Sequence, residues 1–168
     1  MPASPILPAK LIQIALREQG VSETGHTNCG PRVNEYKAAT TLPAAESWPW
    51  CAAFVCWCVQ EALRALGLKE TPTFKRPTTA SAFNLINWSR AQDNTTATKM
   101  RPGSDIRPGD IVIYEFSHTG IALSVPDKAG KFFAIEGNTD AAGSREGGMV
   151  AKKSRRTDQV RARIRFTI

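Results

Sequence analysis

Residues 48–67 read WPWCAAFVCWCVQEALRALG and contain the strongest helix signal in the chain. From Cys51 onward apolar residues recur at helical spacing, and the second half is dominated by the strong helix formers Ala, Leu, Gln and Glu. Gly67 supplies the stop signal. The apolar stripe is broad enough for a helix that is covered on most sides. The sequence therefore predicts a central core helix over residues 51–67.

The segments on either side of this helix differ in their periodicity. Helical spacing of apolar residues predicts further helices over residues 7–19, 33–39 and 79–90. After residue 104 the pattern changes to short β-type runs, at residues 110–116, 119–125, 131–136, 149–154 and 159–168. Helices followed by consecutive short strands are typical of an α+β domain. We therefore expect N-terminal helices packed on a roughly five-stranded antiparallel sheet.

Length and composition limit the class of protein. A chain of 168 residues is enough for one domain, which we expect over 1–168 with an extended tail at about 1–7. The contents of 42% hydrophobic and 22% charged residues exclude intrinsic disorder. No run approaches the ~18 apolar residues of a membrane span. The N-terminus also lacks the pattern of a signal peptide, so we expect a cytoplasmic location in the producing cell.

The net charge of +7 is concentrated at the C-terminal end. The basic residues there are Lys152, Lys153, Arg155, Arg156, Arg161, Arg163 and Arg165. In a regular strand Arg161, Arg163 and Arg165 lie on one face, and Lys153 and Arg155 do the same in the preceding strand. If these strands are neighbours they form a positive patch for an anionic polymer. The alternatives are a solvated outer face or, less favoured, a nucleic-acid-binding domain.

Cys51 is the first candidate for chemistry, because it begins the predicted core helix. Free backbone N–H groups and the helix dipole at this position favour an anion, which promotes the reactive thiolate. The same N–H groups can stabilise an oxyanion formed at an attacked carbonyl. The alternative is that Cys51 is a small apolar residue, like Cys56 and Cys58 in the same helix.

A nucleophilic thiol needs an imidazole partner, and the chain has only two histidines. His26 lies in a polar loop, whereas His118 lies between two predicted strands. Glu136 and Asn138 are two residues apart on a further strand, so one face presents both toward an imidazole. Gly137 between them leaves the opposite face open for close packing. The alternatives are an ordinary exposed histidine and a turn at Glu-Gly-Asn.

Together these segments resemble a known family. A helix-start Cys, a strand His and a polar residue on the next strand follow the chain order of papain-like cysteine hydrolases. Residues 48–55, WPWCAAFV, resemble the nucleophile motif of CHAP domains, NlpC-related cysteine- and histidine-dependent amidohydrolases/peptidases that cut peptidoglycan. Residues 107–113 with 118–121 resemble the second motif of that family, and residues 135–139 the third. Residues 30–36, GPRVNEY, are similar to phage-encoded relatives. The resemblance spans roughly residues 10–140.

The resemblance implies a papain-like CHAP fold and a catalytic set. Cys51 is expected to be the nucleophile and His118 the general base and then acid. Glu136 is expected to orient the imidazole, with Asn138 as a fourth polar member of the site.

The same resemblance suggests residues that contact substrate. Tyr36 or Asn34 is expected to supply the second oxyanion donor, beside the backbone N–H of Cys51. Trp50, together with Trp48, is expected to form a wall of the substrate groove, although core packing is an equal alternative for both rings.

Neither a cofactor nor a metal is expected. Acyl transfer through a thiol needs no cofactor, and residues 21–47 contain no Asp, although some CHAP lysins carry an Asp-rich calcium loop there. A zinc set from His26, Cys29, Cys56 and Cys58 has the wrong spacing.

These expectations combine into a predicted function. The chain is expected to be a monomeric peptidoglycan amidase or endopeptidase, of phage or prophage endolysin type, that acts on the cell wall after release and has no nucleic-acid partner. The alternative is a secreted antibacterial toxin effector with the same chemistry. The sequence leaves open which amide bond is cut.

Overall fold

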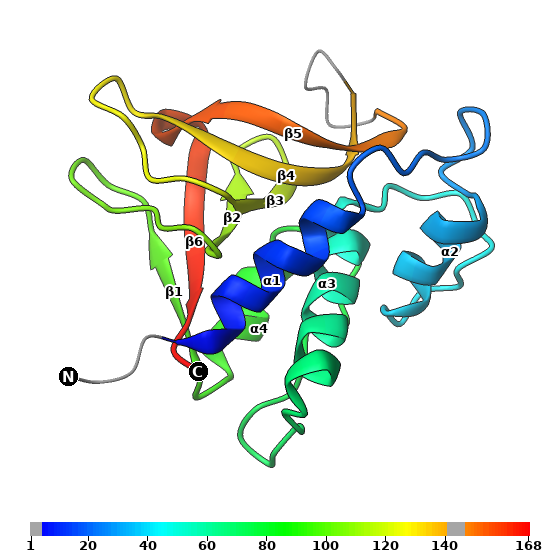
Figure 1. Ribbon diagram of the computed structural model, residues 1–168, viewed down its shortest axis with the longest axis horizontal. Helices are drawn as coiled ribbons and strands as arrows, with labels where there is room; N and C mark the ends of the chain where they lie inside the picture. Colours follow the sequence, from blue (N-terminus) through cyan, green and yellow to red (C-terminus); the bar gives the residue numbers. More distant parts are fainter. Residues whose placement is uncertain (1–4, 141–146) are drawn as a thin grey trace.

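The computed structural model describes residues 5–140 and 147–168, which form four α-helices and one sheet (Figure 1). The helices are α1 (Ile6–Arg17), α2 (Pro31–Ala38), α3 (Cys51–Leu66) and α4 (Asn84–Arg90). The strands are β1 (Thr95–Lys99), β2 (Ile111–Tyr114), β3 (His118–Ala122), β4 (Lys131–Thr139), β5 (Met149–Arg156) and β6 (Val160–Phe166), and a 3₁₀ turn, η1 (Thr157–Gln159), joins the last two. This confirms the predicted α+β class. Among the described residues no helix has the length and apolar character needed to cross a membrane.

The sheet has six antiparallel strands in the order β1-β6-β2-β3-β4-β5, so the expected count of five is one too low. The additional strand is β1, a short Thr-rich edge strand that pairs with β6 from Thr95↔Phe166 to Lys99↔Ala162. Three strands separate β5 from β6 in the sheet, although the two follow each other in the chain. The expectation that the two basic strands are neighbours is therefore wrong.

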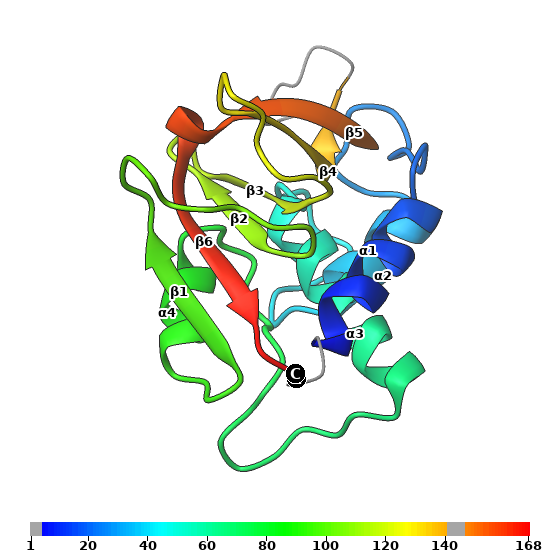
Figure 2. The same cartoon turned by 60° about the vertical axis from the view of Figure 1, so that its left-hand side comes forward.

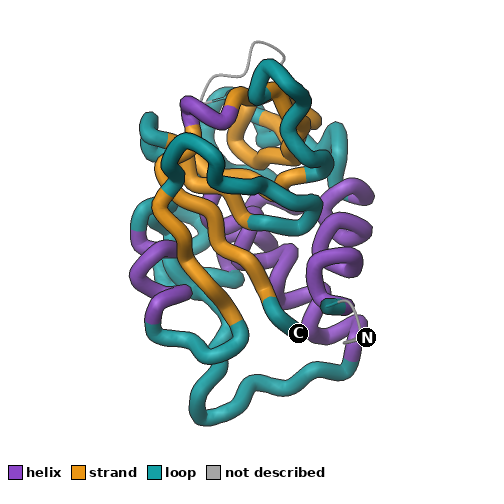
Figure 3. Tube along the Cα trace, turned by 90° about the vertical axis from the view of Figure 1, so that its left-hand side faces the viewer, coloured by secondary structure: helices purple, strands orange, loops and turns teal. Residues whose placement is uncertain are grey.

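Each face of the sheet carries its own apolar cluster. Alternation along β2 sends Ile111 and Ile113 to the face on which α1 and α3 pack, and Val112 and Tyr114 to the other. Helix α3 packs on β3 and β4 and is flanked by α1 and α2, whereas α4 packs on β1 (Figure 2). Helices therefore flank the strands, as the colouring by secondary structure shows (Figure 3). This arrangement places the central helix directly against the middle of the sheet.

Three helices begin at different residues from those predicted, and one of them is α2, which begins at Pro31 instead of residue 33. α1 begins at Ile6, inside the expected tail, because Leu7 is buried and its N–H donates to the carbonyl of Ile168 at 3.0 Å; residues 1–4 of that tail lie outside the described residues. α4 begins at Asn84 instead of residue 79. Before it, the Thr79 hydroxyl accepts a hydrogen bond from the N–H of Ser81 at 3.1 Å, a local bond that competes with helix formation.

The basic residues of β6 are tied to carboxylates. Arg165 donates to both carboxylate oxygens of the buried Asp110, at 2.8 and 2.7 Å, and Arg163 pairs with Asp105 at 3.1 Å. Arg161 remains half-exposed, with Glu115 at 3.4 Å. The predicted open positive face of Arg161, Arg163 and Arg165 is therefore wrong for Arg163 and Arg165, since neighbouring acids neutralise their charges.

Candidate active site

The start of α3 is held against β4 by two contacts. The side-chain oxygen of Asn138 accepts a hydrogen bond from the backbone N–H of Trp50 at 2.6 Å. At Gly137 an added Cβ would lie 2.7 Å from the Cβ of Phe54, which confirms close packing on that face. Cys51 is the first residue of α3 and is almost completely buried. Backbone N–H groups in the first turn of a helix have no acceptor within the helix, so they face the same space as the thiol.

His118 begins β3 beside this helix start and is fully buried. Its Nε2 lies 2.9 Å from Oε2 of Glu136, and because a carboxylate only accepts, the nitrogen donates. Nδ1 has no hydrogen-bond partner among the described residues. Burial lowers the pKa of His118, but interactions with the Cys51 thiol and with Glu136 outweigh it and raise the pKa to about 9. The ring is thus placed to take a proton from sulfur and to hold it.

Glu136 is itself held by Arg155 of β5, which the sequence analysis assigned to the outer basic patch. Nε and Nη2 of Arg155 donate to the two carboxylate oxygens of Glu136 at 2.8 and 2.6 Å, and both side chains are buried. Burial raises the pKa of Glu136, yet the hydrogen bonds from Arg155 and His118 hold it below its ordinary value. The carboxylate therefore stays charged beside the imidazole.

Aromatic rings and a glycine complete the surroundings of the imidazole. The rings of Tyr114 and Phe116 stack with His118 at centroid distances of 5.9 and 6.0 Å. The guanidinium of Arg155 lies 5.0 Å from the ring of Tyr114. At Gly120 an added Cβ would come within 2.6 Å of Cγ of Glu136, so the absence of a side chain there lets the carboxylate reach His118. Sequence reasoning missed these positioning residues, and only Gly120 lies in a recognised motif.

A pocket of about 250 Å³ opens beside Cys51. Its lining includes Trp48 and Pro49 ahead of the helix, the segment 80–82, and Ser117 just before the histidine. The predicted contribution of Trp48 to the groove is therefore consistent with its position. A second pocket of about 550 Å³ lies between α1, α2 and α3, and its lining contains neither Cys51 nor His118.

Two of the residues predicted to contact substrate belong to the core. Trp50 is fully buried, and its ring N–H donates to Glu23 at 3.1 Å. Tyr36 is also fully buried, its ring centroid lies 5.7 Å from that of Trp50, and its hydroxyl donates a hydrogen bond to Glu18 at 2.5 Å. Their predicted role at the substrate surface is wrong, because neither side chain reaches that surface.

The third such residue, Asn34, lies on α2. Its side-chain oxygen accepts a hydrogen bond from the N–H of Gly30 at 3.3 Å. Asn34 does not line the pocket beside Cys51, so the geometry gives no support to its predicted role as an oxyanion donor.

The other helix cysteines differ from Cys51 in their environment. Burial raises the pKa of the Cys56 thiol to about 12 and that of Cys58 well above its ordinary value. Both are therefore inert packing residues at neutral pH. Within residues 5–140 and 147–168, no group of three or more His, Cys, Asp or Glu side chains is arranged to hold a metal ion.

The family assignment follows from comparison of the sequence with family models. The model of the CHAP domain matches residues 43–138, which is more than half of the chain. The chain belongs to the CHAP domain family. The match includes Cys51, His118 and Glu136 and ends at Asn138, whereas Arg155 lies beyond it.

The fold of this CHAP domain also resembles that of a solved structure. The crystal structure of the wild-type endolysin LysIME-EF1 superposes with a TM-score of 0.55 at 17% sequence identity. The superposition covers 95% of this chain and 64% of the endolysin chain. At this identity the similarity concerns the fold alone. No curated protein sequence matches the chain.

Proposed function

We propose that this CHAP domain is a peptidoglycan hydrolase that cleaves an amide bond with Cys51 as nucleophile. The observation that carries the proposal is the buried hydrogen-bonded series His118–Glu136–Arg155 beside the start of α3. The Cys51 thiol at that helix start raises the pKa of His118, whose Nε2 donates to Glu136. The family and the endolysin-like fold support the cell wall as the target.

The reaction follows from the geometry in two half-reactions. His118 accepts the thiol proton, and Sγ of Cys51 attacks the amide carbonyl carbon, so that a C–S bond forms and the oxygen becomes an oxyanion. The N–H groups of the first turn of α3 stabilise that charge. When the C–N bond breaks, His118 returns its proton to the leaving amine, and an acyl-enzyme remains.

The second half-reaction restores the enzyme. Water gives a proton to His118 while its oxygen attacks the thioester carbon. The C–S bond then breaks, the sulfur recovers the proton, and the free acid leaves. Glu136 stabilises the imidazolium in both halves and remains ionised throughout. In this proposal the domain is a monomer. Like an endolysin, it acts on the cell wall after its release from the producing cell.

Loss of turbidity of purified bacterial cell walls tests the proposal. Cys51→Ala is expected to leave the walls intact, whereas the matched variant Cys56→Ala, in the same helix, is expected to clear them. Clearing by Cys51→Ala would contradict the proposal. Mass spectrometry of the released fragments then distinguishes a sugar-to-alanine amidase from a peptidase by the new termini.

A further inference from the structure

A third pocket carries positive charge. It has a volume of about 340 Å³ and lies between α4 and the strands β1 and β6. Arg90, Lys99 and Arg161 line it, and its floor includes Phe83 and Ile86. No acidic side chain is among its lining residues in the described part of the chain. A concave surface with several positive charges and no acid attracts anions.

The charges of this basic pocket are available to a ligand. Arg90 and Lys99 are exposed and form no ion pair with any described residue. Arg161 has Glu115 at 3.4 Å, but both side chains are about half exposed. Such an exposed ion pair is weak, so an anionic group of a ligand can replace Glu115 as the partner of Arg161. The guanidinium of Arg161 also lies 4.5 Å from the ring of Phe83, which holds it over the pocket.

The linings of the basic pocket and of the catalytic pocket meet at consecutive residues of the chain. Ala82 lines the pocket beside Cys51, and the next residue, Phe83, lines the basic pocket. Consecutive Cα atoms are about 3.8 Å apart, so the two linings are close together at this point of the chain. Glu115, which contacts Arg161, is likewise two residues from Ser117 of the catalytic pocket.

We propose that the basic pocket is a substrate subsite for a carboxylate-bearing peptide segment of peptidoglycan. The proposal rests on the proposed function, because the occupant must be continuous with the amide bond at Cys51. Guanidinium and ammonium groups bind the carboxylate, and the apolar floor of Phe83 and Ile86 receives methyl groups of the same peptide.

Steady-state kinetics on soluble peptidoglycan fragments tests this subsite. The triple variant Arg90→Gln, Lys99→Gln, Arg161→Gln is compared with the parent on fragments with free carboxylates and on chemically amidated ones. Three charge contacts at an exposed site predict a rise in KM of about tenfold or more on the free carboxylates. We expect kcat to stay within about twofold and KM on the amidated fragments to change little, since chemistry at Cys51 is untouched.

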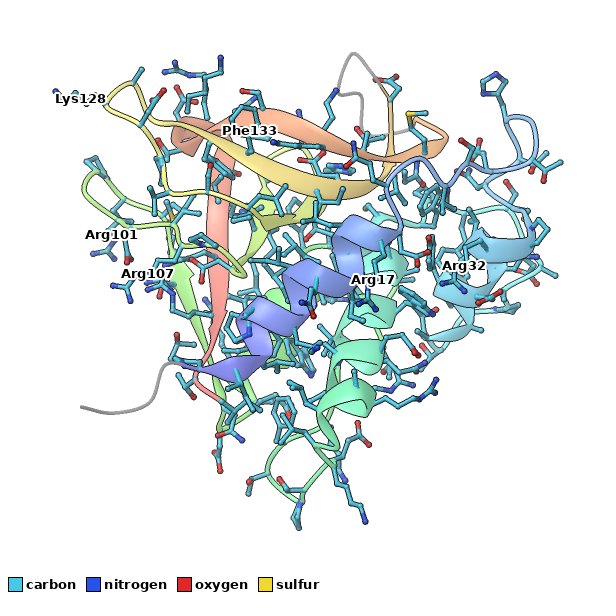
Figure 4. The ribbon with its side chains drawn as sticks, viewed as in Figure 1. Arg17, Arg32, Arg101, Arg107, Lys128 and Phe133 are labelled. Carbon is cyan, nitrogen blue, oxygen red and sulfur yellow. The ribbon has the colours of Figure 1, made fainter. Side chains whose placement is uncertain are left out.

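A matched control removes the same charge elsewhere. The variant Lys69→Gln, Arg101→Gln, Lys128→Gln changes three exposed cations, of which Arg101 and Lys128 extend from loops into solvent (Figure 4). Its KM is expected to remain near that of the parent. Equal increases in KM for both triple variants would overturn the subsite, because the effect would then come from net charge.

Three further outcomes separate the explanations. An active parent whose KM is unchanged by the Arg90, Lys99 and Arg161 substitutions overturns the subsite but leaves the proposed function intact. A parent that cleaves no peptidoglycan overturns the proposed function itself. In the third outcome the parent binds a phosphodiester wall polymer, the triple variant does not, and both have the same KM on the peptides. This outcome would assign the pocket to that polymer and would also overturn the proposal.

Discussion

Replacement of Arg155 by Met is expected to destabilise the fold strongly and in a pH-dependent way. The guanidinium donates two hydrogen bonds to the buried carboxylate of Glu136. Met keeps much of the apolar volume but leaves that carboxylate without its buried cation. Removing one partner of a buried ion pair costs about 3–5 kcal/mol, which is a large part of the stability of a single domain.

The pH dependence follows from the proton affinity of Glu136. In the parent its pKa lies below the ordinary value, so the carboxylate stabilises the fold above its unfolded pKa, and this stability is lost as the pH falls. In the variant only His118 still offsets burial, so the folded pKa of Glu136 is higher than in the parent. Less of the stability that the charged carboxylate contributes above its unfolded pKa then remains. The deficit is therefore larger near about pH 7 than near about pH 4.

Urea denaturation at several pH values measures the deficit. With m of about 2 kcal/mol/M, the midpoint at neutral pH is expected to fall by about 2 M. Arg156→Met is the matched control, because the next residue of the same strand pairs with Asp158 and both side chains are more than half exposed. The double variant Glu136→Gln, Arg155→Met removes both charges and is expected to recover part of the stability. An Arg155→Met deficit that is independent of pH, or no larger than that of Arg156→Met, would refute this reasoning.

Three other predictions concern the same site. The value of kcat/KM is expected to fall as the pH rises above about 9, where His118 loses its proton. In a pH–rate profile Glu136→Gln should move this fall to lower pH, and an unmoved profile would contradict the pairing of His118 with Glu136. Gly120→Ala is expected to cost about 1–3 kcal/mol in thermal unfolding and to reduce activity, because its Cβ would lie 2.6 Å from Cγ of Glu136 and 2.9 Å from the backbone oxygen of Ile135; an unchanged melting temperature would contradict this. Cell-wall clearing is expected to be unchanged by excess EDTA, and a loss that Ca²⁺ restores would reveal a calcium site.

The sequence predicted the parts of the site that depend on local pattern. Cys51 could be placed because a helix signal begins at that residue, and His118 and Glu136 because each lies in a short motif on a strand. The same local reasoning could not separate Trp50 from Trp48. Both rings flank the proline before Cys51, and only burial shows that one packs in the core while the other lines the pocket.

The parts that were missed depend on contacts between distant segments. Arg155 looked like any other cation of a basic C-terminal region, and only the pairing of β4 with β5 brings it to Glu136. β1 contains no strong apolar alternation, and its strand character depends on β6, which follows more than sixty residues later. Asn138 was expected beside the imidazole, but its φ of +55° redirects the chain, and its side chain holds the backbone of Trp50.

The central position of β6 has a consequence for folding during synthesis. The strand made last among the described residues inserts between β1 and β2, two strands made much earlier. Until the ribosome has released Phe166, β1 has no strand partner and β2 lacks a partner along one edge. The sheet that supports His118 and Glu136 therefore closes only after translation of its final strand, and a nascent chain or a product truncated before β6 carries the catalytic motifs without the fold that aligns them.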